Sequence, residues 1–229
     1  MTRPITTLFL LMSVDGKIST GATDEFDVDR DFPLIQATKR GLHQYYEIEK
    51  TTDIWSLNSG RVLSKVGINN PKLNPQYIGV NFVIIDNTHI QLAGLLNMSK
   101  KADKLIIVTS NRNHIAFIMK NKIENLHILY YPILDFEDMF FRLNSIYDCK
   151  NITLQTGGTL NNLFLRYKLI DYLNLVVAPV LIGGKDTPSL IDGQSLTKRS
   201  DLSLLGGLKL LSTNVLTDSY LQLKYKVIS

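Results

Sequence analysis

Short apolar runs rich in isoleucine, valine and leucine recur along the chain, and this pattern constrains the fold more than any other feature. Such runs are typical of strands that are covered on both faces of a sheet. Helical patterns lie between several of them, so we expect an α/β fold with a mainly parallel sheet and helices on both faces. The strands predicted in this way are 8–12, 53–57, 80–85, 104–109, 127–131, 151–155 and 172–178.

Apolar residues at helical spacing predict four helical segments. The first spans about residues 32–48, with a break expected near Gly41, and the second is the short segment 115–119. The third spans 136–147, and Asp135 is expected to cap its N-terminus. The fourth spans 159–167.

The C-terminal segment has a different pattern. Two β-like runs, 208–215 and 220–227, flank turn residues at 217–219. Polar and apolar residues alternate in the second run, which is typical of a half-exposed strand. We therefore expect an antiparallel hairpin that closes one edge of the sheet. No shift in composition marks a boundary, so the chain is expected to form one domain, 1–229.

Composition excludes several classes of function. A net charge of +4 is too small to indicate a nucleic-acid partner. The single cysteine, Cys149, excludes an internal disulfide and fits a reducing cytoplasm. The four histidines are far apart in sequence, so no metal site is expected. The apolar run 5–12 is too short to span a membrane, and no membrane association is expected.

A glycine pair follows the predicted strand 151–155 and precedes a helical pattern. A strand that turns at Gly157 and Gly158 into a helix leaves backbone N–H groups at the turn, and these groups attract an anion, usually a phosphate. A tight turn without any ligand explains the same glycines equally well.

Polar, glycine-rich and basic segments also follow other predicted strands. Ligands of open α/β sheets bind at the carboxyl ends of the strands. Arginine forks and hydroxyl groups in such positions are partners for phosphate, so we expect a site for a phosphorylated ligand. The segments are 13–18, 58–63, 110–112, 157–159 and 179–186.

Four segments, taken in order, resemble the reductase domain of the riboflavin-biosynthesis deaminase–reductases, which also exists as stand-alone proteins. They are Ser-Val-Asp-Gly-Lys-Ile at 13–18, Gly-Gly-Thr-Leu-Asn at 157–161, Leu-Ile-Asp-Tyr-Leu at 169–173 and Ala-Pro-Val-Leu-Ile-Gly-Gly at 178–184. The resemblance covers nearly the whole chain. It implies a dihydrofolate-reductase-like fold with a central mixed, mostly parallel sheet, a cytoplasmic enzyme, NADPH as hydride donor, and a homodimer. The implied substrate is a phosphorylated ribosylamino-pyrimidine, either 5-amino-6-(5-phosphoribosylamino)uracil or a diaminopyrimidinone.

The resemblance also implies which residues bind the cofactor. The glycine turn matches the family's pyrophosphate site, and the pair at 60–61 resembles the Gly-Arg pair of dihydrofolate reductases. The end of the strand 104–109 matches the site of the 2′-phosphate, and the end of the strand 8–12 is expected near the nicotinamide. Two arginines and a hydroxyl favour NADPH over NADH. The residues implied are Met12, Ser13, Gly60, Arg61, Val62, Thr109, Ser110, Arg112, Gly157, Gly158, Thr159, Leu160 and Asn161.

The substrate side of the implied site departs from the family pattern. Asp15 and Gln155 are the expected substrate contacts, although Asp15-Gly16 is also a common turn pair. Gln155 replaces a glutamate, and Arg61 and Lys65 stand where the family usually has Thr and Asp. In the family, the helix before the second strand often ends with an arginine that helps to hold the substrate. The nearest match to that arginine in this chain is Glu49. Hydride transfer requires no nucleophile, and no catalytic residue is assigned.

Two alternatives to the pyrimidine reductase remain. A non-catalytic NADP-binding regulatory module would keep the glycine turn and Arg61 but lack the substrate pocket. A dihydrofolate-reductase-like enzyme with a pterin or another small substrate would need an acidic residue near the end of the segment 32–48, where Glu47 and Glu49 lie.

Overall fold

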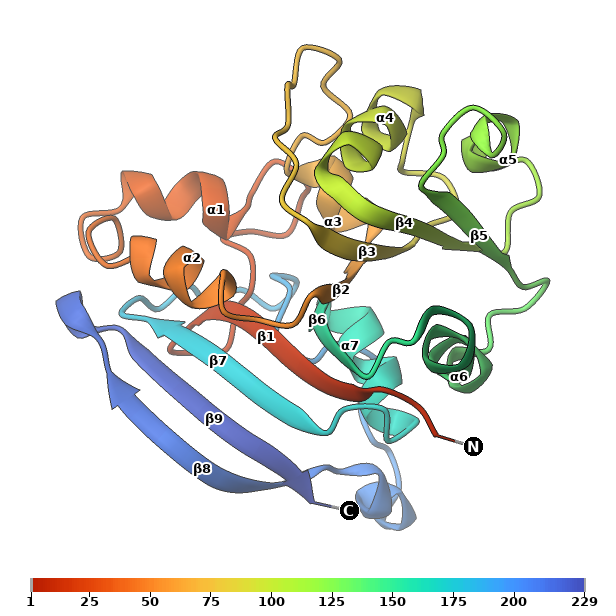
Figure 1. The fold of residues 1–229 in the computed structure, drawn as a ribbon. Coiled ribbons are helices and arrows are strands. Elements are labelled where there is room, and N and C mark those ends of the chain that lie inside the picture. Colours follow the sequence, from red (N-terminus) through yellow and green to blue (C-terminus); the bar gives the residue numbers. More distant parts are fainter. Residues whose placement is uncertain (1, 229) are drawn as a thin grey trace. The chain divides into compact units, whose positions relative to one another are not determined.

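The computed structural model describes residues 2–228, and its elements are labelled in Figure 1. They group into two compact units, each made of segments that are far apart in the sequence. The first unit comprises Asp53–Thr156 with the N-terminal residues up to Pro4, and the second comprises Ile5–Thr52 with the chain from Gly157 onward. The prediction of a single domain over 1–229 stays a prediction.

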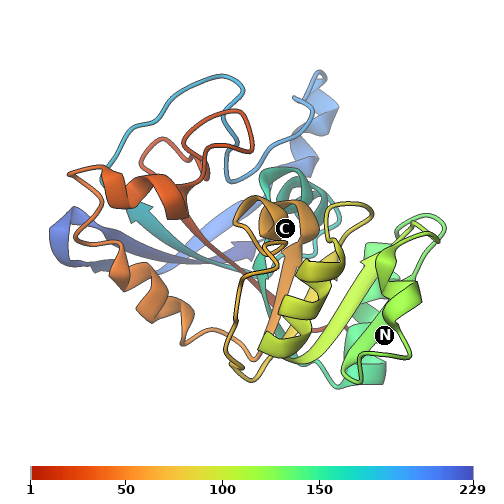
Figure 2. The same ribbon diagram turned by 90° about the horizontal axis from the view of Figure 1, so that it is seen from above.

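The sheet of the first unit is entirely parallel. Its strands have the order β5-β4-β3-β2-β6, and each neighbouring pair is parallel. The helices α4 and α5 pack against β4 and β5 (Figure 2). The strands are β2 (Trp55–Ser59), β3 (Val80–Ile85), β4 (Ala102–Thr109), β5 (Leu126–Tyr130) and β6 (Asn151–Gln155). The helices are α3 (Gly60–Lys65), α4 (Leu92–Lys101), α5 (Ile115–Met119) and α6 (Phe136–Tyr147).

The expected strands and two of the expected helices of this unit are confirmed. The Asp135 side chain accepts a hydrogen bond from the Asp138 backbone, which confirms it as the cap of α6. Sequence periodicity did not predict α3 or α4. The helix α3 is only six residues long, and α4 is held mainly by burying Leu95 and Met98 against the sheet. Tertiary packing therefore specifies both helices more strongly than their local sequence does.

The sheet of the second unit is mixed. Its strands have the order β1-β7-β9-β8; β1 pairs with β7 in parallel, and β9 pairs antiparallel with both β7 and β8. This arrangement confirms the C-terminal antiparallel hairpin. The strands are β1 (Ile5–Ser13), β7 (Tyr172–Ala178), β8 (Gly207–Val215) and β9 (Leu221–Ile228). The helices are α1 (Val28–Asp31), η1 (Phe32–Leu34), α2 (His43–Glu49), α7 (Gly158–Arg166), η2 (Arg199–Leu204) and η3 (Thr217–Ser219).

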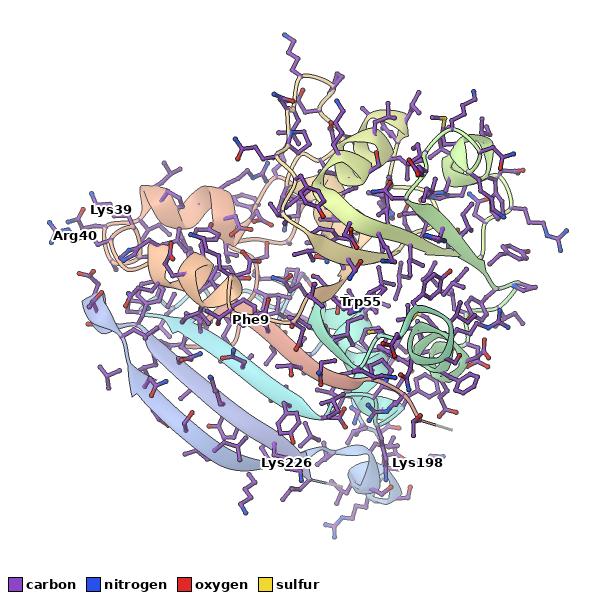
Figure 3. All side chains as sticks on the ribbon, in the orientation of Figure 1. Phe9, Lys39, Arg40, Trp55, Lys198 and Lys226 are labelled. Carbon is purple, nitrogen blue, oxygen red and sulfur yellow. The ribbon has the colours of Figure 1, made fainter. Side chains whose placement is uncertain are left out.

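The expected helix over 32–48 is wrong in its first half. Pro33 lies in η1, and a continuous helix begins only at His43, after the expected break at Gly41. A Cβ at Gly41 would lie 2.4 Å from the Tyr220 ring, so the break allows this ring to pack against the backbone. Phe9 of β1, labelled in Figure 3, stacks on Tyr45 of α2 with ring centroids 5.0 Å apart. This aromatic contact is central to the core of the unit.

The fold class predicted from the sequence is confirmed. The chain is α/β, most of its strand pairs are parallel, and the antiparallel pairs are at the C-terminus. The carboxyl ends of parallel strands therefore meet at one edge in each unit, where the candidate site residues lie.

Candidate functional site

The glycine turn of the second unit has the strand–turn–helix geometry expected for anion binding. Gly157 is the N-cap of the nine-residue helix α7, and no side chain caps this end of the helix. The N–H groups of the first turn have no partner within their helix, and the helix dipole adds partial positive charge there. A helix N-terminus without a side-chain cap is a common binding place for an anion.

Close packing explains the second glycine of this turn. A Cβ at Gly158 would lie 2.3 Å from the Ser189 carbonyl oxygen and 2.5 Å from Oδ2 of Asp192. The Asp192 backbone N–H donates to the Gly158 carbonyl at 3.0 Å. The buried Asn161 side chain donates to the Leu190 carbonyl at 2.8 Å. The segment 189–192 thus holds the first turn of α7 in place, and Asn161 acts by anchoring it.

Asp15 ties two loops of the second unit together. Its carboxylate accepts hydrogen bonds from Ser13 Oγ at 2.6 Å, from the Ile182 N–H at 3.1 Å and from the Gly183 N–H at 2.6 Å. The Ser13 hydrogen bond is the main cause that lowers the pKa of Asp15 to about 2; desolvation opposes it, and the two backbone bonds assist it. The carboxylate is exposed and ionised at neutral pH.

The same residues confirm a tight turn at Asp15-Gly16. The Gly16 N–H donates to the Ser13 carbonyl at 3.0 Å, and Gly16 has a φ of +76°, which favours glycine. Ser13 is fully buried, whereas Met12 is partly exposed at the end of β1. The hydrogen bonds of Asp15 therefore give it a structural role. Its contact with a substrate stays a prediction.

In the first unit, Gly60 and Arg61 begin α3 at the carboxyl end of β2. Ser59 caps this helix by accepting a hydrogen bond from the Val62 N–H at 3.3 Å. A Cβ at Gly60 would lie 2.3 Å from Oδ1 of Asp86, so this glycine allows the carboxylate to approach the backbone. Arg61 is exposed on the first turn of this helix.

A buried carboxylate beside this turn was missed by sequence reasoning. Asp86 lies directly after β3 and accepts hydrogen bonds from His114 Nε2 at 2.9 Å and from the Ile90 N–H at 2.9 Å. Burial acts to raise the pKa of Asp86, but the hydrogen bonds from His114, Ile90 and His89 outweigh it and lower the pKa to about 2. The polar run 86–89, which follows a predicted strand, was the available signal.

The turn after β4 is organised by Asn87. Its Oδ1 accepts hydrogen bonds from Thr109 Oγ1 at 3.0 Å and from the Ser110 backbone and hydroxyl at 2.8 and 3.1 Å. The Asn111 side chain donates to the Asn87 carbonyl at 2.7 Å. Thr109 is fully buried, so its hydroxyl shapes the turn in this conformation. Direct contact of Thr109 and Ser110 with a cofactor stays a prediction.

Arg112 is exposed just beyond this turn and lies over an aromatic ring. Its Nε donates to the Tyr130 hydroxyl at 2.8 Å, and its guanidinium carbon lies 5.1 Å from the centre of the Tyr130 ring. Arg112, Tyr130 and Phe117 line an open cavity of about 320 Å³. The ring orients the guanidinium, whose terminal N–H groups suit an anionic ligand.

Gln155, at the end of β6, belongs to an uncharged polar network. Its Oε1 accepts a hydrogen bond from Ser56 Oγ at 2.9 Å, and Ser56 Oγ accepts from Asn58 Nδ2 at 2.8 Å. Lys65 lies in the last turn of α3 in the same unit, whereas Glu49 ends α2 in the second unit.

The structure gathers the expected site residues at one edge of each unit. The first unit holds Gly60, Arg61, Val62, Thr109, Ser110, Arg112 and Gln155, and the second holds Met12, Ser13, Asp15, Gly157, Gly158, Thr159, Leu160 and Asn161. Between residues 2 and 228, no three His, Cys, Asp or Glu side chains cluster in a way that would hold a metal ion. Within the same range, every helix is too short or too polar to cross a membrane.

Curated relatives cover most of the chain. A reductase of Methanothermobacter thermautotrophicus, named 2,5-diamino-6-ribosylamino-4(3H)-pyrimidinone 5′-phosphate reductase, is 21% identical over 215 residues, which are 87% of this chain and 88% of the relative. A protein of the same name from Aquifex aeolicus is 24% identical over 214 residues, which are 88% of each chain.

Solved structures share the fold. Acinetobacter baumannii RibD superposes with a TM-score of 0.68 at 18% identity, over 99% of this chain and 59% of that protein. This chain therefore spans a little over half the length of that relative. The Saccharomyces riboflavin biosynthesis reductase Rib7 has a TM-score of 0.61 at 13% identity, over 99% of this chain and 90% of that protein.

The family model carries the assignment. The model of the RibD C-terminal domain matches residues 4–219, which include the glycine turn, the Asp15 loop and both arginines. Reductases of this family typically use NAD(P)H. The chain belongs to the RibD C-terminal domain family.

Proposed function

We propose that this protein is a cytoplasmic NADPH-dependent reductase that delivers a hydride to a carbonyl or imine carbon of a phosphorylated ribosylamino-pyrimidine. Family membership and the two curated relatives, both named as diaminopyrimidinone 5′-phosphate reductases, support the reaction class. NADPH, when bound, supplies the hydride, while the protein supplies binding, orientation and electrostatics.

The observation that carries this proposal is that the N-terminus of α7 has no side-chain cap. Gly157 caps the helix without a side chain, so the first-turn N–H groups are available to the cofactor pyrophosphate. The segment 189–192 packs directly against Gly158 and fixes the direction of these donors. A pre-oriented set of donors binds a phosphate without the cost of ordering a loop.

Two exposed arginines favour NADPH over NADH. Arg61 begins α3 and Arg112 follows β4, both in the first unit and both at the carboxyl ends of parallel strands. A guanidinium makes charge-assisted hydrogen bonds to phosphate, and only NADPH carries a phosphate on the adenosine ribose. Tyr130 holds the guanidinium of Arg112 in place.

On the substrate side, we assign Asp15 and Gln155 to contacts with polar groups of the substrate. With a pKa of about 2, Asp15 holds no proton at neutral pH and accepts hydrogen bonds there rather than acting as an acid. Gln155 is uncharged, and its amide group is of the same chemical kind as an amide-like edge of a pyrimidine.

Fluorescence titration with NADPH and with NADH tests the cofactor assignment. We expect Arg61→Ala and Arg112→Ala each to raise the Kd for NADPH about tenfold, the loss of one charge-assisted contact, and to leave the Kd for NADH nearly unchanged. Lys65→Ala, on the last turn of the same α3 helix, is the matched control. Absence of binding to either nucleotide in the wild type would refute the assignment.

A non-catalytic NADP-binding module is the second candidate. Three changes at the family's substrate positions favour this non-catalytic module. Gln155, Lys65 and Glu49 stand where the family usually has a glutamate, an aspartate and an arginine, so the charge differs at each position. Oxidation of NADPH with ribosylamino-pyrimidine phosphates separates the two candidates: turnover supports the reductase, and tight binding without turnover supports the module. Dihydrofolate in a parallel reaction tests the pterin alternative.

A further inference from the structure

Arg112 lies on a short exposed segment that is anchored at both of its ends. On one side, the Asn111 side chain donates a hydrogen bond to the Asn87 carbonyl at 2.7 Å. On the other side, the buried ring of His114 donates through Nε2 to Asp86 Oδ2 at 2.9 Å. Asp86 and Asn87 are consecutive residues after β3, so one point of the sheet edge fixes both ends of the segment 111–114.

Asp86 is held firmly enough to act as a fixed reference point. Its Oδ2 accepts hydrogen bonds from His114 and from the Ile90 N–H, both at 2.9 Å. Its Oδ1 accepts from the backbone and the ring of His89 at 3.0 and 3.1 Å. A Cβ at Gly60 would lie 2.3 Å from Oδ1, so the start of α3 also packs against the carboxylate. These contacts leave the buried side chain little freedom to move.

His114 transmits the position of Asp86 to the segment that carries Arg112. Its ring Nδ1 accepts a hydrogen bond from the Ala116 N–H at 3.1 Å and so caps α5, while Nε2 holds Asp86. Its backbone N–H donates to the Asn111 carbonyl at 3.1 Å, which closes the turn around Arg112. Because Arg112 is only two residues before His114, a shift of the ring also moves the arginine.

The same histidine also fixes the aromatic wall of the cavity beside Arg112. The Phe117 N–H donates to the His114 carbonyl at 3.0 Å in the first turn of α5. The Phe117 ring packs edge-on against Tyr130, with centroids 6.0 Å apart, and the Tyr130 hydroxyl accepts from Arg112 Nε at 2.8 Å. His114 therefore determines both the backbone that carries the guanidinium and the rings that orient it.

We propose that Asp86 and His114 are positioning residues that hold Arg112 where it selects a nucleotide with a phosphate on the adenosine ribose, an inference that rests on the proposed binding of NADPH. Both side chains are buried, so they act on the ligand through the segment 111–114 and through Phe117. Apolar replacements of a buried ionic pair are often equally stable, but only hydrogen bonds fix a direction. Direction matters here because a charge-assisted bond to phosphate weakens steeply when it is misaligned.

Two substitutions separate the two hydrogen bonds of the His114 ring. His114→Asn places an acceptor where Nδ1 lies and keeps the cap of α5, but its side chain is too short to reach Asp86. His114→Gln places a donor where Nε2 lies and keeps the bond to Asp86, but it loses the cap. Both variants should melt at a lower temperature than the wild type, whereas only His114→Asn should lose preference for NADPH over NADH.

Fluorescence titration of the full chain with NADPH and with NADH measures this preference. We expect His114→Asn to raise the Kd for NADPH at least about fivefold and to change the Kd for NADH by less than about twofold. In the Arg112→Ala background, His114→Asn should weaken NADPH binding no further, because both changes remove the same contact. His89→Asn is the matched control, since His89 bonds the same carboxylate from its own loop and not from α5, and it should leave the preference unchanged.

Two results would overturn the proposal while the cofactor assignment stands. One is an equal loss of preference in His114→Asn and His114→Gln, which would reduce the histidine to a general contribution to stability. The other is additivity of His114→Asn and Arg112→Ala, which would show that the pair does not act through the arginine. In both cases the wild type still binds NADPH. A wild type that binds neither nucleotide would refute the cofactor assignment and this inference together.

Discussion

His114 and Asp86 form a buried pair in which the histidine is held in one tautomer. The His114 Nδ1 atom accepts a hydrogen bond from the Ala116 backbone at 3.1 Å and so caps α5. Its Nε2 therefore carries the proton and donates it to Asp86 Oδ2 at 2.9 Å. Because Asp86 also packs against Gly60, this pair links the start of α5 to the start of α3 within the first unit.

Asp86 makes the stability of the protein depend on pH. Its folded pKa of about 2 lies below the roughly 3.9 of an unfolded aspartate, so its contribution is complete above pH ~4 and is lost as the pH falls toward 2. We expect this contribution to be about 2 kcal/mol. Urea unfolding of the wild type and Asp86→Asn should show a difference that shrinks between pH 6 and pH 3. Asp103→Asn, at an exposed carboxylate, is the control; an equal pH dependence in both variants would contradict this prediction.

Gly158→Ala should destabilise the protein even without a ligand. The added methyl group would overlap the Ser189 carbonyl and the Asp192 carboxylate, and such overpacking costs about 1–3 kcal/mol. Thermal unfolding in the absence of nucleotide measures the loss. Thr159→Ala, at the next position and exposed, should change little. An unchanged melting temperature in Gly158→Ala would contradict the tight packing of Ser189 and Asp192 against this glycine.

Asp15→Ala should loosen the loop around Ile182 and Gly183. The substitution removes the acceptor of both backbone N–H groups, so these amides should exchange with solvent at least about tenfold faster. Hydrogen exchange resolved by residue provides the measurement. The matched control is Asp186→Ala, which removes an exposed carboxylate from the same loop region. Equal exchange in the two variants would mean that Asp15 does not hold the loop.

Cys149 should react with thiol reagents only after the protein unfolds. The side chain is fully buried, and burial, assisted by the charges of Asp53 and Asp148, raises the pKa of the thiol to about 12. Thiolate is the reactive form, so both access and ionisation limit the reaction. Maleimide labelling followed by mass spectrometry, in buffer and in urea, tests this. Rapid labelling of the native protein would contradict the structure around this residue.

The hydrophobic pattern predicted the strands well, because a strand buried on both faces needs an uninterrupted apolar run. The strands β3, β6 and β7 have the bounds that the sequence indicated. The short helix α3 was not predicted, since six residues carry too little periodicity to identify a helix. The expected helix over 32–48 failed because Pro33 and the packing of Tyr220 against Gly41 divide the segment.

For the candidate site, spacing indicated the turns but not the partners of their side chains. The turn at Gly157 was expected, whereas the anchoring of α7 by Ser189, Leu190 and Asp192 depends on residues about thirty positions away. Contact of Thr109 with a cofactor stays a prediction, but the hydrogen bond that its hydroxyl donates to Asn87 Oδ1 at 3.0 Å could not be read from the sequence. No periodicity encodes such contacts, because they form only when separate strands end at the same edge.

The sequence by itself determined the order of the strands, the C-terminal hairpin and the family to which the chain is similar, since these depend on local patterns and on short motifs. Only the tertiary structure decided that Asp86 and His114 are buried together and that Asp15 holds the 182–183 loop. The physical reason is that burial and hydrogen bonding depend on which segments, far apart in the sequence, come into contact. The pairing of the strands decides these contacts.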